Sequence, residues 1–287
     1  MTFLRVKTTT KVTHTKVFYV GSTPTDVDSG DVSVTITRFD GTSVQAASNA
    51  THTTTGTYTF APNAVALVDA HLMTWSGTLA GAAVQFTDVI DYVGDFYFGL
   101  SQAKTAQSIA ATYTDAQIAE ARIRAEDECE RICGQAMVPR FGWQTVYGTG
   151  RSRIHVANRA LRTVRAVSVD GVAWTQDQLD DLIPTPWGSI RRKAGAIWPA
   201  DARIRVEFEH GADYPPPEIP PQAMARCKQM LIAPKSGVPD RALSWTTNEG
   251  GTYQMSVPSH DKTGDPNVDA VYARWGGRRR GKRSVFA

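Results

Sequence analysis

Two short motifs in the chain match motifs of serine β-lactamases, in which a serine acts as the nucleophile. Ser101-Gln-Ala-Lys104 has the Ser-x-x-Lys spacing and Lys262-Thr-Gly264 matches a second motif. The third motif, Ser-Asp-Asn, is missing, and Ser101 lies in a stretch of small residues. Chance explains such short matches, so we assign no catalytic residues and expect no enzyme activity.

Cofactor and metal signals are equally poor. Gly148-Thr-Gly150 lacks the third glycine and the following helix of a dinucleotide site, so it is interpreted as a turn. Cys129 and Cys133 are spaced by one helical turn and could share a zinc ion, but a structural site needs two more nitrogen or sulfur ligands. The six histidines are scattered singly. We therefore favour small buried hydrophobes on a helix face and expect no metal and no cofactor.

The basic C-terminal segment, 274–287, can bind an anionic partner. It contains Arg274, Arg278, Arg279, Arg280, Lys282 and Arg283 and no acidic residue. Without these six, 25 basic residues face 28 acidic ones, whereas the whole chain carries +3. Because Arg278–Arg283 has no apolar face and cannot be core, the segment is either a disordered solubilising end or an arm. As an arm it would bind either phosphates, with release of their counterions, or an acidic groove of a protein. We favour the arm.

Two further sets of residues are interpreted structurally. Glu126-Asp-Glu128 with Glu130 is predicted to be a solvated helix face, with a role opposite a basic partner surface as the alternative. Four tryptophans are predicted to be core or strand-packing residues in preference to ligand-stacking platforms: Trp75, Trp143, Trp174 and Trp198.

The clearest helix positions several of these residues and runs from Tyr113 to Gly134. Thr114 and Gln117 form a capping box, and Gly134 can adopt the left-handed conformation that ends a helix. Three- and four-residue steps place a narrow apolar stripe on one face, which is expected to be the core-facing side: Ile118, Ala121, Ala125, Cys129, Ile132 and Cys133.

Residues 1–95 read as β-structure. Val32, Val34 and Ile36 alternate with polar residues, and Val84, Phe86, Ile90 and Tyr92 repeat the pattern with Asp88 as the exception. Asp40-Gly41 signals a tight turn, and aromatic residues suited to a core lie in Gly56–Phe60 and Leu72–Trp75. About seven short strands predict an all-β, antiparallel, immunoglobulin-like sandwich, without the cysteine pair of antibody domains.

Residues 96–113 change character and are predicted to be a linker that is partly helical. Residues 114–287 alternate between helix and strand signals, which predicts an α+β domain of antiparallel helices and a small antiparallel sheet. Asp170-Gly171 turns a hairpin, and Ile204, Val206 and Phe208 point inward from one strand. A helix over 221–233 buries Met224, Cys227 and Leu231 and ends at Pro234, and a last helix starts at Asp265-Pro266 with Val268, Val271, Tyr272 and Trp275 on one face.

Length and composition allow two domains with buried cores. The chain has 287 residues, of which 41% are hydrophobic and 21% charged, as in ordinary globular proteins. No apolar run is long enough for a membrane span, and the N-terminus lacks the apolar core of a signal peptide. A reducing compartment fits the three cysteines best.

Residues 114–280 resemble head–tail adaptor (connector) proteins of long-tailed bacteriophages, in particular the actinobacteriophage branch. The order and spacing of several segments carry this resemblance rather than any single motif: Tyr113–Gly134, Val138-Pro-Arg140, Val167–Gly171, Val206–Gly211, Pro215-Pro-Pro217, Asp240-Arg-Ala242, Glu249–Thr252 and Asn267–Tyr272. An immunoglobulin-like domain in front departs from the shortest adaptors, which begin at the helix.

The resemblance implies a structural virion protein. It implies a ring, usually of twelve copies, that docks on the portal protein, receives a stopper or tail-completion protein on its other face and lets genomic DNA pass through its lumen. Its place would be the virion neck, assembled in the host cytoplasm without contact to membranes. The helices 115–133 and 221–233 would form the subunit core and part of the ring contact, and the basic segment would reach the portal.

Two other classes stay open. A nucleic-acid-binding protein would act through the basic segment, with salt-sensitive binding by the free monomer. An immunoglobulin-like surface adhesin would bind cells or glycans through residues 1–95. An enzyme is a more distant alternative.

Overall fold

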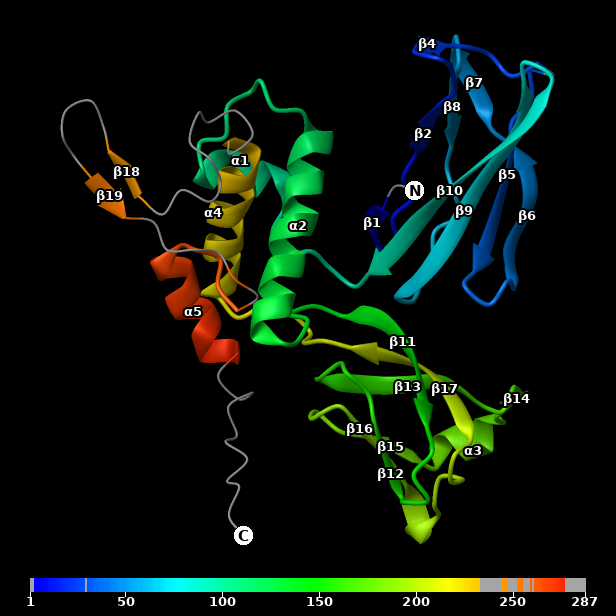
Figure 1. The fold of residues 1–287 in the computed structure, drawn as a ribbon, viewed down its shortest axis with the longest axis vertical. Coiled ribbons are helices and arrows are strands. Elements are labelled where there is room, and N and C mark those ends of the chain that lie inside the picture. Colours follow the sequence, from blue (N-terminus) through cyan, green and yellow to red (C-terminus); the bar gives the residue numbers. More distant parts are fainter. Residues whose placement is uncertain are drawn as a thin grey trace. The chain divides into compact units, whose positions relative to one another are not determined.

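The computed structural model describes residues 3–28, 30–232, 244–246, 252–254, 259 and 261–276. The chain divides into unit 1, residues 1–95 with 140–142, and unit 2, residues 96–139 with 143–287. Figure 1 shows unit 1 as a set of strands and unit 2 as helices followed by a second group of strands. No helix in the described part of the chain combines the length and apolarity that a membrane crossing requires.

Unit 1 is built from strands alone. One sheet has the order β1-β10-β9-β5-β6, a second β2-β8-β7, and a short ribbon pairs β3 with β4. The strands are β1 (Phe3–Lys7), β2 (His14–Val17), β3 (Tyr19–Val20), β4 (Thr23–Pro24), β5 (Ser33–Arg38), β6 (Ser43–Asn49), β7 (Thr51–Thr54), β8 (Thr57–Phe60), β9 (Asp69–Leu79) and β10 (Ala82–Val93).

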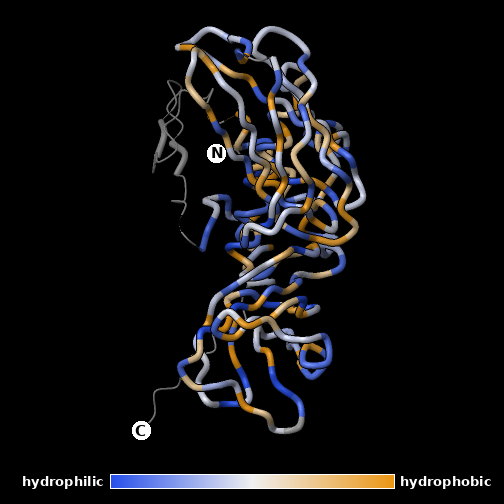
Figure 2. Tube along the Cα trace, turned by 90° about the vertical axis from the view of Figure 1, so that its right-hand side faces the viewer, coloured by the Kyte–Doolittle hydropathy of each residue, from blue (hydrophilic) through white to orange (hydrophobic). Residues whose placement is uncertain are grey.

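The two larger sheets of unit 1 share one core. Val34 and Ile36 of β5 and Trp75 of β9 pack with Tyr58 and Phe60 of β8. The alternation predicted for β5 is confirmed, and Figure 2 shows hydrophobic and hydrophilic residues alternating along the strands. The predicted turn is confirmed as well, since Gly41 has a φ of 87° and Thr42 N donates to Asp40 Oδ1 at 2.9 Å.

Two features of unit 1 differ from the prediction. The sheet is not wholly antiparallel, because β1 pairs with β10 in parallel. These strands lie at opposite ends of the unit's sequence, so no tight hairpin dictates an antiparallel direction. Phe86, predicted to point inward, is 39% exposed and lies under Lys16, whose Nζ is 5.2 Å from the ring centre. The immunoglobulin-like topology itself stays a prediction.

Unit 2 begins with the segment predicted to be a linker. It contains α1 (Leu100–Ala106), and Tyr97, Phe98 and Ala103 belong to the helical core. α2 (Asp115–Cys133) and α4 (Ile219–Ile232) run antiparallel, with α5 (Pro266–Gly276) packed against both (Figure 1). Pro221 lies in the first turn of α4 as predicted, whereas Pro234 lies outside the described residues.

The β-part of unit 2 has a core of its own. The sheet β11-β17-β13-β14 and the sheet β12-β16-β15 together bury Ile154, Ile190, Trp198 and Phe208. Its elements are β11 (Arg140–Tyr147), β12 (Arg153–His155), β13 (Leu161–Val169), β14 (Val172–Ala173), α3 (Gln176–Asp180), β15 (Leu182–Pro184), β16 (Ser189–Arg192), the 3-10 turn η1 (Lys193–Gly195) and β17 (Arg203–His210). A separate ribbon pairs β18 (Ser244–Thr246) with β19 (Thr252–Gln254).

The strand predictions for this part are confirmed. Asp170 and Gly171, with φ of 49° and 85°, turn between β13 and β14, which pair antiparallel. On β17, Ile204, Val206 and Phe208 are fully buried. The described pairings of β13 with β17 and β14 are antiparallel, as expected for the small sheet.

His14 makes the stability of unit 1 sensitive to pH. The residue begins β2 and is buried, and burial lowers its pKa below the usual value of 6.5, although Asp88 acts in the opposite direction. The unfolded chain takes up a proton at His14 near the usual pKa, whereas the folded unit takes it up only at a lower pH. Stability contributed by neutral His14 is therefore present above about pH 6.5 and is lost as the pH falls toward the lowered pKa.

We expect the opening free energy of β2 and β8 to be smaller at about pH 5.5 than at about pH 7.5, and His14→Gln to reduce this difference. Hydrogen exchange followed by mass spectrometry on the full chain, converted to opening free energies, measures it. An equal loss of protection in both proteins would show that His14 is not responsible.

Candidate assembly site in the helical core

α2 starts and ends where its sequence signals predict. Gln117 N donates to Thr114 Oγ1 at 3.3 Å, and Thr114 N donates to Gln117 Oε1 at 2.9 Å, which closes the capping box. Gly134, with a φ of 69°, ends the helix, and its N–H donates to the Glu130 carbonyl at 2.8 Å. Local chemistry is therefore sufficient to delimit this helix.

The stripe of α2 lies in the helical core of unit 2. The residues of the stripe are all buried: Ile118, Ala121, Ala125, Cys129, Ile132 and Cys133. They pack with Met224, Cys227 and Leu231 of α4 and with Val268 and Tyr272 of α5. Because most of the stripe is small, the neighbouring helices can approach closely, as expected of a compact helical core.

The interpretation of the acidic run as a solvated face is wrong. Glu126 is fully buried and accepts from Tyr97 N at 2.9 Å, while the Tyr97 hydroxyl donates to Glu130 at 3.0 Å. Asp127 is exposed. The segment before α1 covers this side of the helix, and a helix period read on α2 alone gives no sign of that cover. The aromatic run Phe96-Tyr97-Phe98 was the available signal.

Arg122 completes the buried polar side of α2. Its guanidinium lies 3.4 Å from the centre of the Phe96 ring and donates to the Phe98 carbonyl at 3.2 Å. A planar guanidinium can stack on a ring and still donate hydrogen bonds in its own plane, parallel to the ring, which a lysine cannot do. Arg122 thus fixes the segment before α1 onto the helix.

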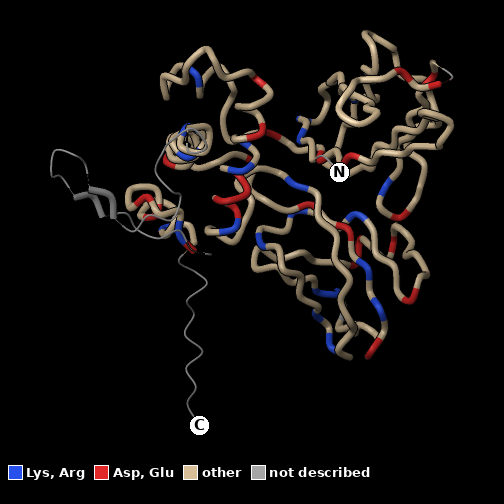
Figure 3. The backbone as a smooth tube through the Cα atoms, turned by 45° about the horizontal axis from the view of Figure 1, so that its top comes forward, with Lys and Arg blue, Asp and Glu red and all other residues tan. Residues whose placement is uncertain are grey.

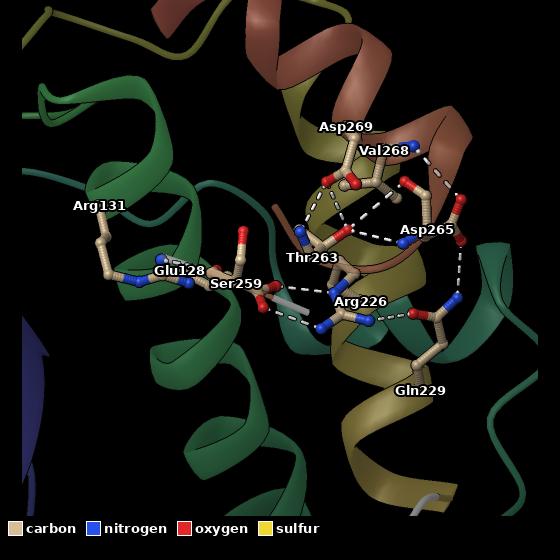
Figure 4. A network of polar contacts seen from close by, with 9 residues as sticks. All are labelled: Glu128, Arg131, Arg226, Gln229, Ser259, Thr263, Asp265, Val268 and Asp269. Atoms are coloured by element: carbon tan, nitrogen blue, oxygen red, sulfur yellow. Dashed lines mark hydrogen bonds and ion pairs between the residues drawn. The ribbon is translucent and has the colours of Figure 1, made fainter. Parts of the chain in front are cut away.

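The strongest polar link between α2 and α4 is the pair Glu128–Arg226. Arg226 Nε and Nη2 donate to the two carboxylate oxygens of Glu128 at 2.7 and 2.9 Å (Figure 4). The side chains are 13% and 15% exposed. Burial alone would lower the pKa of Arg226, but the bonds from Glu128 outweigh it and the pKa is raised. Arg226 is therefore held charged by a two-pronged contact in a largely dry setting.

The network continues from Arg226 to the start of α5. Arg226 donates to Gln229, and Gln229 Nε2 donates to Asp265 Oδ2 at 2.9 Å (Figure 4). The other oxygen of Asp265 accepts from Asn267 N and Val268 N at 2.9 and 3.4 Å, which caps α5. Burial by itself would raise the pKa of Asp265, but these hydrogen bonds have the larger, opposite effect, so the pKa of Asp265 is lowered. One chain of contacts thus joins three helices.

The β-lactamase-like motifs have structural roles. Thr263 is buried, and its N–H and hydroxyl donate to Asp269 Oδ1 at 2.6 and 2.8 Å (Figure 4), which braces the first turn of α5. Lys104 pairs with Asp115 at the start of α2. Among the described residues no hydrogen bond or ion pair joins the two motifs.

α5 ends where the basic segment begins. Arg274 is exposed, Trp275 Nε1 donates to Glu218 at 3.2 Å, and a Cβ built on Gly276 would lie 2.8 Å from the Ile132 carbonyl oxygen. The end of α5 is therefore in backbone contact with the end of α2. The other predicted contact residues, 278–283, lie outside the described residues, as do 240–242 and 249–251.

The cysteines and tryptophans take the following places. Cys129 Sγ lies 3.8 Å from Cys133 Sγ, burial raises the pKa of Cys129, and no group of three potential metal ligands is present in the described ranges. Burial also raises the pKa of Cys227 to about 11.

Trp75 and Trp198 are buried, and Trp174 stacks on Trp198 with ring centres 5.0 Å apart. Trp143 is 46% exposed and so is not a core residue, but the Arg205 guanidinium of the adjacent strand β17 lies 5.0 Å from its ring centre, which agrees with the strand-packing alternative.

Gly148-Thr-Gly150 lies in the connection between β11 and β12, with a bend at Gly150. A Cβ built on Gly148 would lie 1.7 Å from the Pro199 carbonyl oxygen, so only glycine allows this approach. The segment shows no strand-to-helix transition of the kind a dinucleotide site requires.

No protein-family model and no curated protein matches the chain. It is similar to chains in three solved structures. The first is the neck of an empty gene transfer agent (GTA) particle computed with C6 symmetry, with a TM-score of 0.44 and 14% identity over 62% of this chain and 89% of that chain. The second is the virion of a native GTA particle, with a TM-score of 0.43 and 14% identity over 62% of this chain and 89% of that chain. The third is the neck of a native GTA particle computed with C12 symmetry, with a TM-score of 0.41 and 12% identity over 63% of this chain and 93% of that chain. Likenesses this weak establish neither a fold nor a role.

Glu128→Gln should destabilise unit 2 by about 3 kcal/mol, because Arg226 is left buried without its counter-charge. Glu128→Leu with Arg226→Met should cost less than either single change, since no charge is then left unpaired. Urea unfolding of the full chain measures both. Glu120→Gln is the matched control, because Glu120 pairs with Arg124 on the exposed side of the same helix and should cost about 0.5 kcal/mol or less. Equal costs for Glu128→Gln and Glu120→Gln would refute the assignment.

Gly276→Ala should loosen α5, because its Cβ would meet the Ile132 carbonyl oxygen. We expect a loss of about 1–3 kcal/mol in the opening free energy of α5 amides, measured by hydrogen exchange. Gly99→Ala serves as control, since nothing lies within 4 Å of the added Cβ. Unchanged protection of α5 in Gly276→Ala would contradict the close approach.

Proposed function

We propose that this chain is a structural neck protein of a long-tailed phage or phage-like particle. In this proposal it forms a ring, of about twelve copies by the family resemblance, that docks on the portal and connects the DNA-filled head to the tail. One observation carries it: the polar network from Glu128 to Asp265 joins α5 to α2 and α4, and so fixes where the basic segment leaves the subunit.

The segments that carry the family resemblance support the proposal by their places. Tyr113–Gly134 corresponds to α2, Val167–Gly171 to the end of β13 and its turn, Val206–Gly211 to the end of β17, and Asn267–Tyr272 to α5. They all belong to unit 2, and α2 and α5 share one core. A shared order of sequence segments thus corresponds to one physical module, which is what a common adaptor domain requires.

The neighbouring subunit is proposed to contact the exposed strip of α2. Because Glu126, Glu128 and Glu130 are engaged inside the subunit, the helix offers Glu120, Arg124 and Asp127 at three- and four-residue steps. This strip carries both signs of charge, so copies of the chain can pair acidic with basic groups around a ring.

The remaining parts of the proposal concern the domains and partners. Residues 1–95 would be an immunoglobulin-like domain outside the ring, 96–113 the connection, and 114–287 the adaptor domain. A stopper or tail-completion protein would bind the face away from the portal, and genomic DNA would pass through the lumen. Assembly would take place in the host cytoplasm.

The basic segment would bind an acidic or nucleic-acid-lined groove of the portal assembly. Each copy contributes Arg274 and the five basic residues that follow. Contacts of this kind are individually weak and salt-sensitive, but repetition around a ring makes them collectively strong.

Deleting residues 277–287 should abolish docking on the portal and leave the subunit folded. Electron microscopy of the chain mixed with its portal is the measurement, with wild-type chain expected as a ring on the portal's outer end. Unchanged thermal unfolding of the deletion variant shows that it is folded.

A second variant separates charge from length. Replacing Arg278, Arg279, Arg280, Lys282 and Arg283 by Gln keeps the segment's length and should also abolish docking, because the charge is what the portal binds. Normal docking by the truncated chain would refute the proposed role of the segment, and absence of any ring with wild-type chain would refute the neck assignment.

A further inference from the structure

The outer side of the three-stranded sheet β12-β16-β15 carries two arginines directly opposite each other. Arg153 of β12 pairs in register with Arg191 of β16, and the next pair is Ile154 with Ile190. Both isoleucines are buried, and side chains alternate along a strand, so Arg153 and Arg191 point away from the core and are exposed.

These arginines have no partner in the described part of the chain. Neither side chain makes a hydrogen bond or an ion pair there, and the same holds for exposed Arg151, two residues before Arg153. Like charges at directly opposed positions of a sheet destabilise it. The fold therefore holds a local repulsion at this face, and an anion bound across both strands would relieve it.

Arg153 also lines a groove. It has a volume of about 690 Å³, and among its lining residues are Tyr147, Thr149, Arg151, Ser152, Arg153 and His155. Tyr147 is 68% exposed, and no acidic residue lines the groove. The close approach of Gly148 to Pro199 shapes the loop that forms this wall. Figure 3 shows Lys and Arg recurring along the strands in the β-part of unit 2.

We infer that this face binds the phosphate backbone of double-stranded DNA without reading its base sequence. Arginine, serine, threonine and tyrosine are the side chains that commonly bond phosphate oxygens in protein–DNA complexes. An acidic protein partner is less favoured, because a protein interface has a central cluster of exposed apolar or aromatic anchors. In this groove Ile154 is only 2% exposed, which leaves Val146 and Tyr147 as apolar or aromatic side chains beside Thr149, Arg151, Ser152, Arg153 and His155. The inference does not rest on the proposed ring.

Binding of a short random-sequence duplex to the full chain tests it, with fluorescence anisotropy at several salt concentrations. Each arginine that neutralises a phosphate contributes about one unit to the slope of log K against log salt. Arg153→Gln with Arg191→Gln should lower that slope by about two units and weaken binding at least about tenfold at low salt.

The matched control is Lys7→Gln with Arg162→Gln. It removes the same charge, but from basic residues that pair with Asp95 and Asp213. We expect its affinity to stay within about twofold of wild type. Thermal unfolding of both double variants verifies that they are folded.

Three results would overturn the inference. In the first, Arg153→Gln with Arg191→Gln leaves affinity and slope unchanged while deletion of 277–287 removes binding, so that the basic segment alone binds DNA. In the second, both double variants weaken binding equally, which is an effect of net charge. In the third, the Arg153/Arg191 variant binds DNA normally and loses a portal or other virion protein. Portal docking depends on other residues, so loss of DNA binding alone leaves the neck proposal intact.

Discussion

The helical part of unit 2 depends on one buried ion pair, Glu128 with Arg226. Moving two charges out of water costs several kcal/mol for each ion, and only close, two-pronged geometry repays it. The small residues of the α2 stripe would tolerate more than one register against α4, but the ion pair is satisfied in one register only. Arg226 also donates to Gln229, and Gln229 donates to Asp265. Because Asp265 caps α5, the position of α5 depends on the same ion pair.

This constraint separates the surfaces of unit 2 by their chemistry. Glu126, Glu128 and Glu130 of α2 are bonded inside the subunit by Tyr97 and Arg226, and the exposed strip of the same helix carries both signs of charge. The β-part has its own core around Trp198 and Phe208, and it carries arginines that no described carboxylate neutralises. The slightly basic total therefore conceals an uneven distribution, in which Glu128 is paired inside the subunit while Arg153 and Arg191 are available to an anionic partner.

Local patterns predicted much of the fold correctly. The capping box and Gly134 delimit α2, the period of two on β5 and β17 buries the correct residues, and Asp170-Gly171 turns its hairpin. Each of these signals acts within a few residues, so neighbours in space cannot easily override it. The ring, the portal and the immunoglobulin-like topology are of another kind, since they depend on partners or strand order, and they stay proposals.

The sequence by itself determined where α2 begins and ends and which residues of α2, β5 and β17 face a core, because caps, turns and periodicity are local. Only the tertiary structure decided what covers the other sides. It buried Glu126 under residues 96–98, exposed Trp143, paired β1 with β10 in parallel and placed Arg153 against Arg191. These outcomes depend on contacts between residues far apart in sequence, and the burial and the charge partners that such contacts bring cannot be read from spacing along one segment.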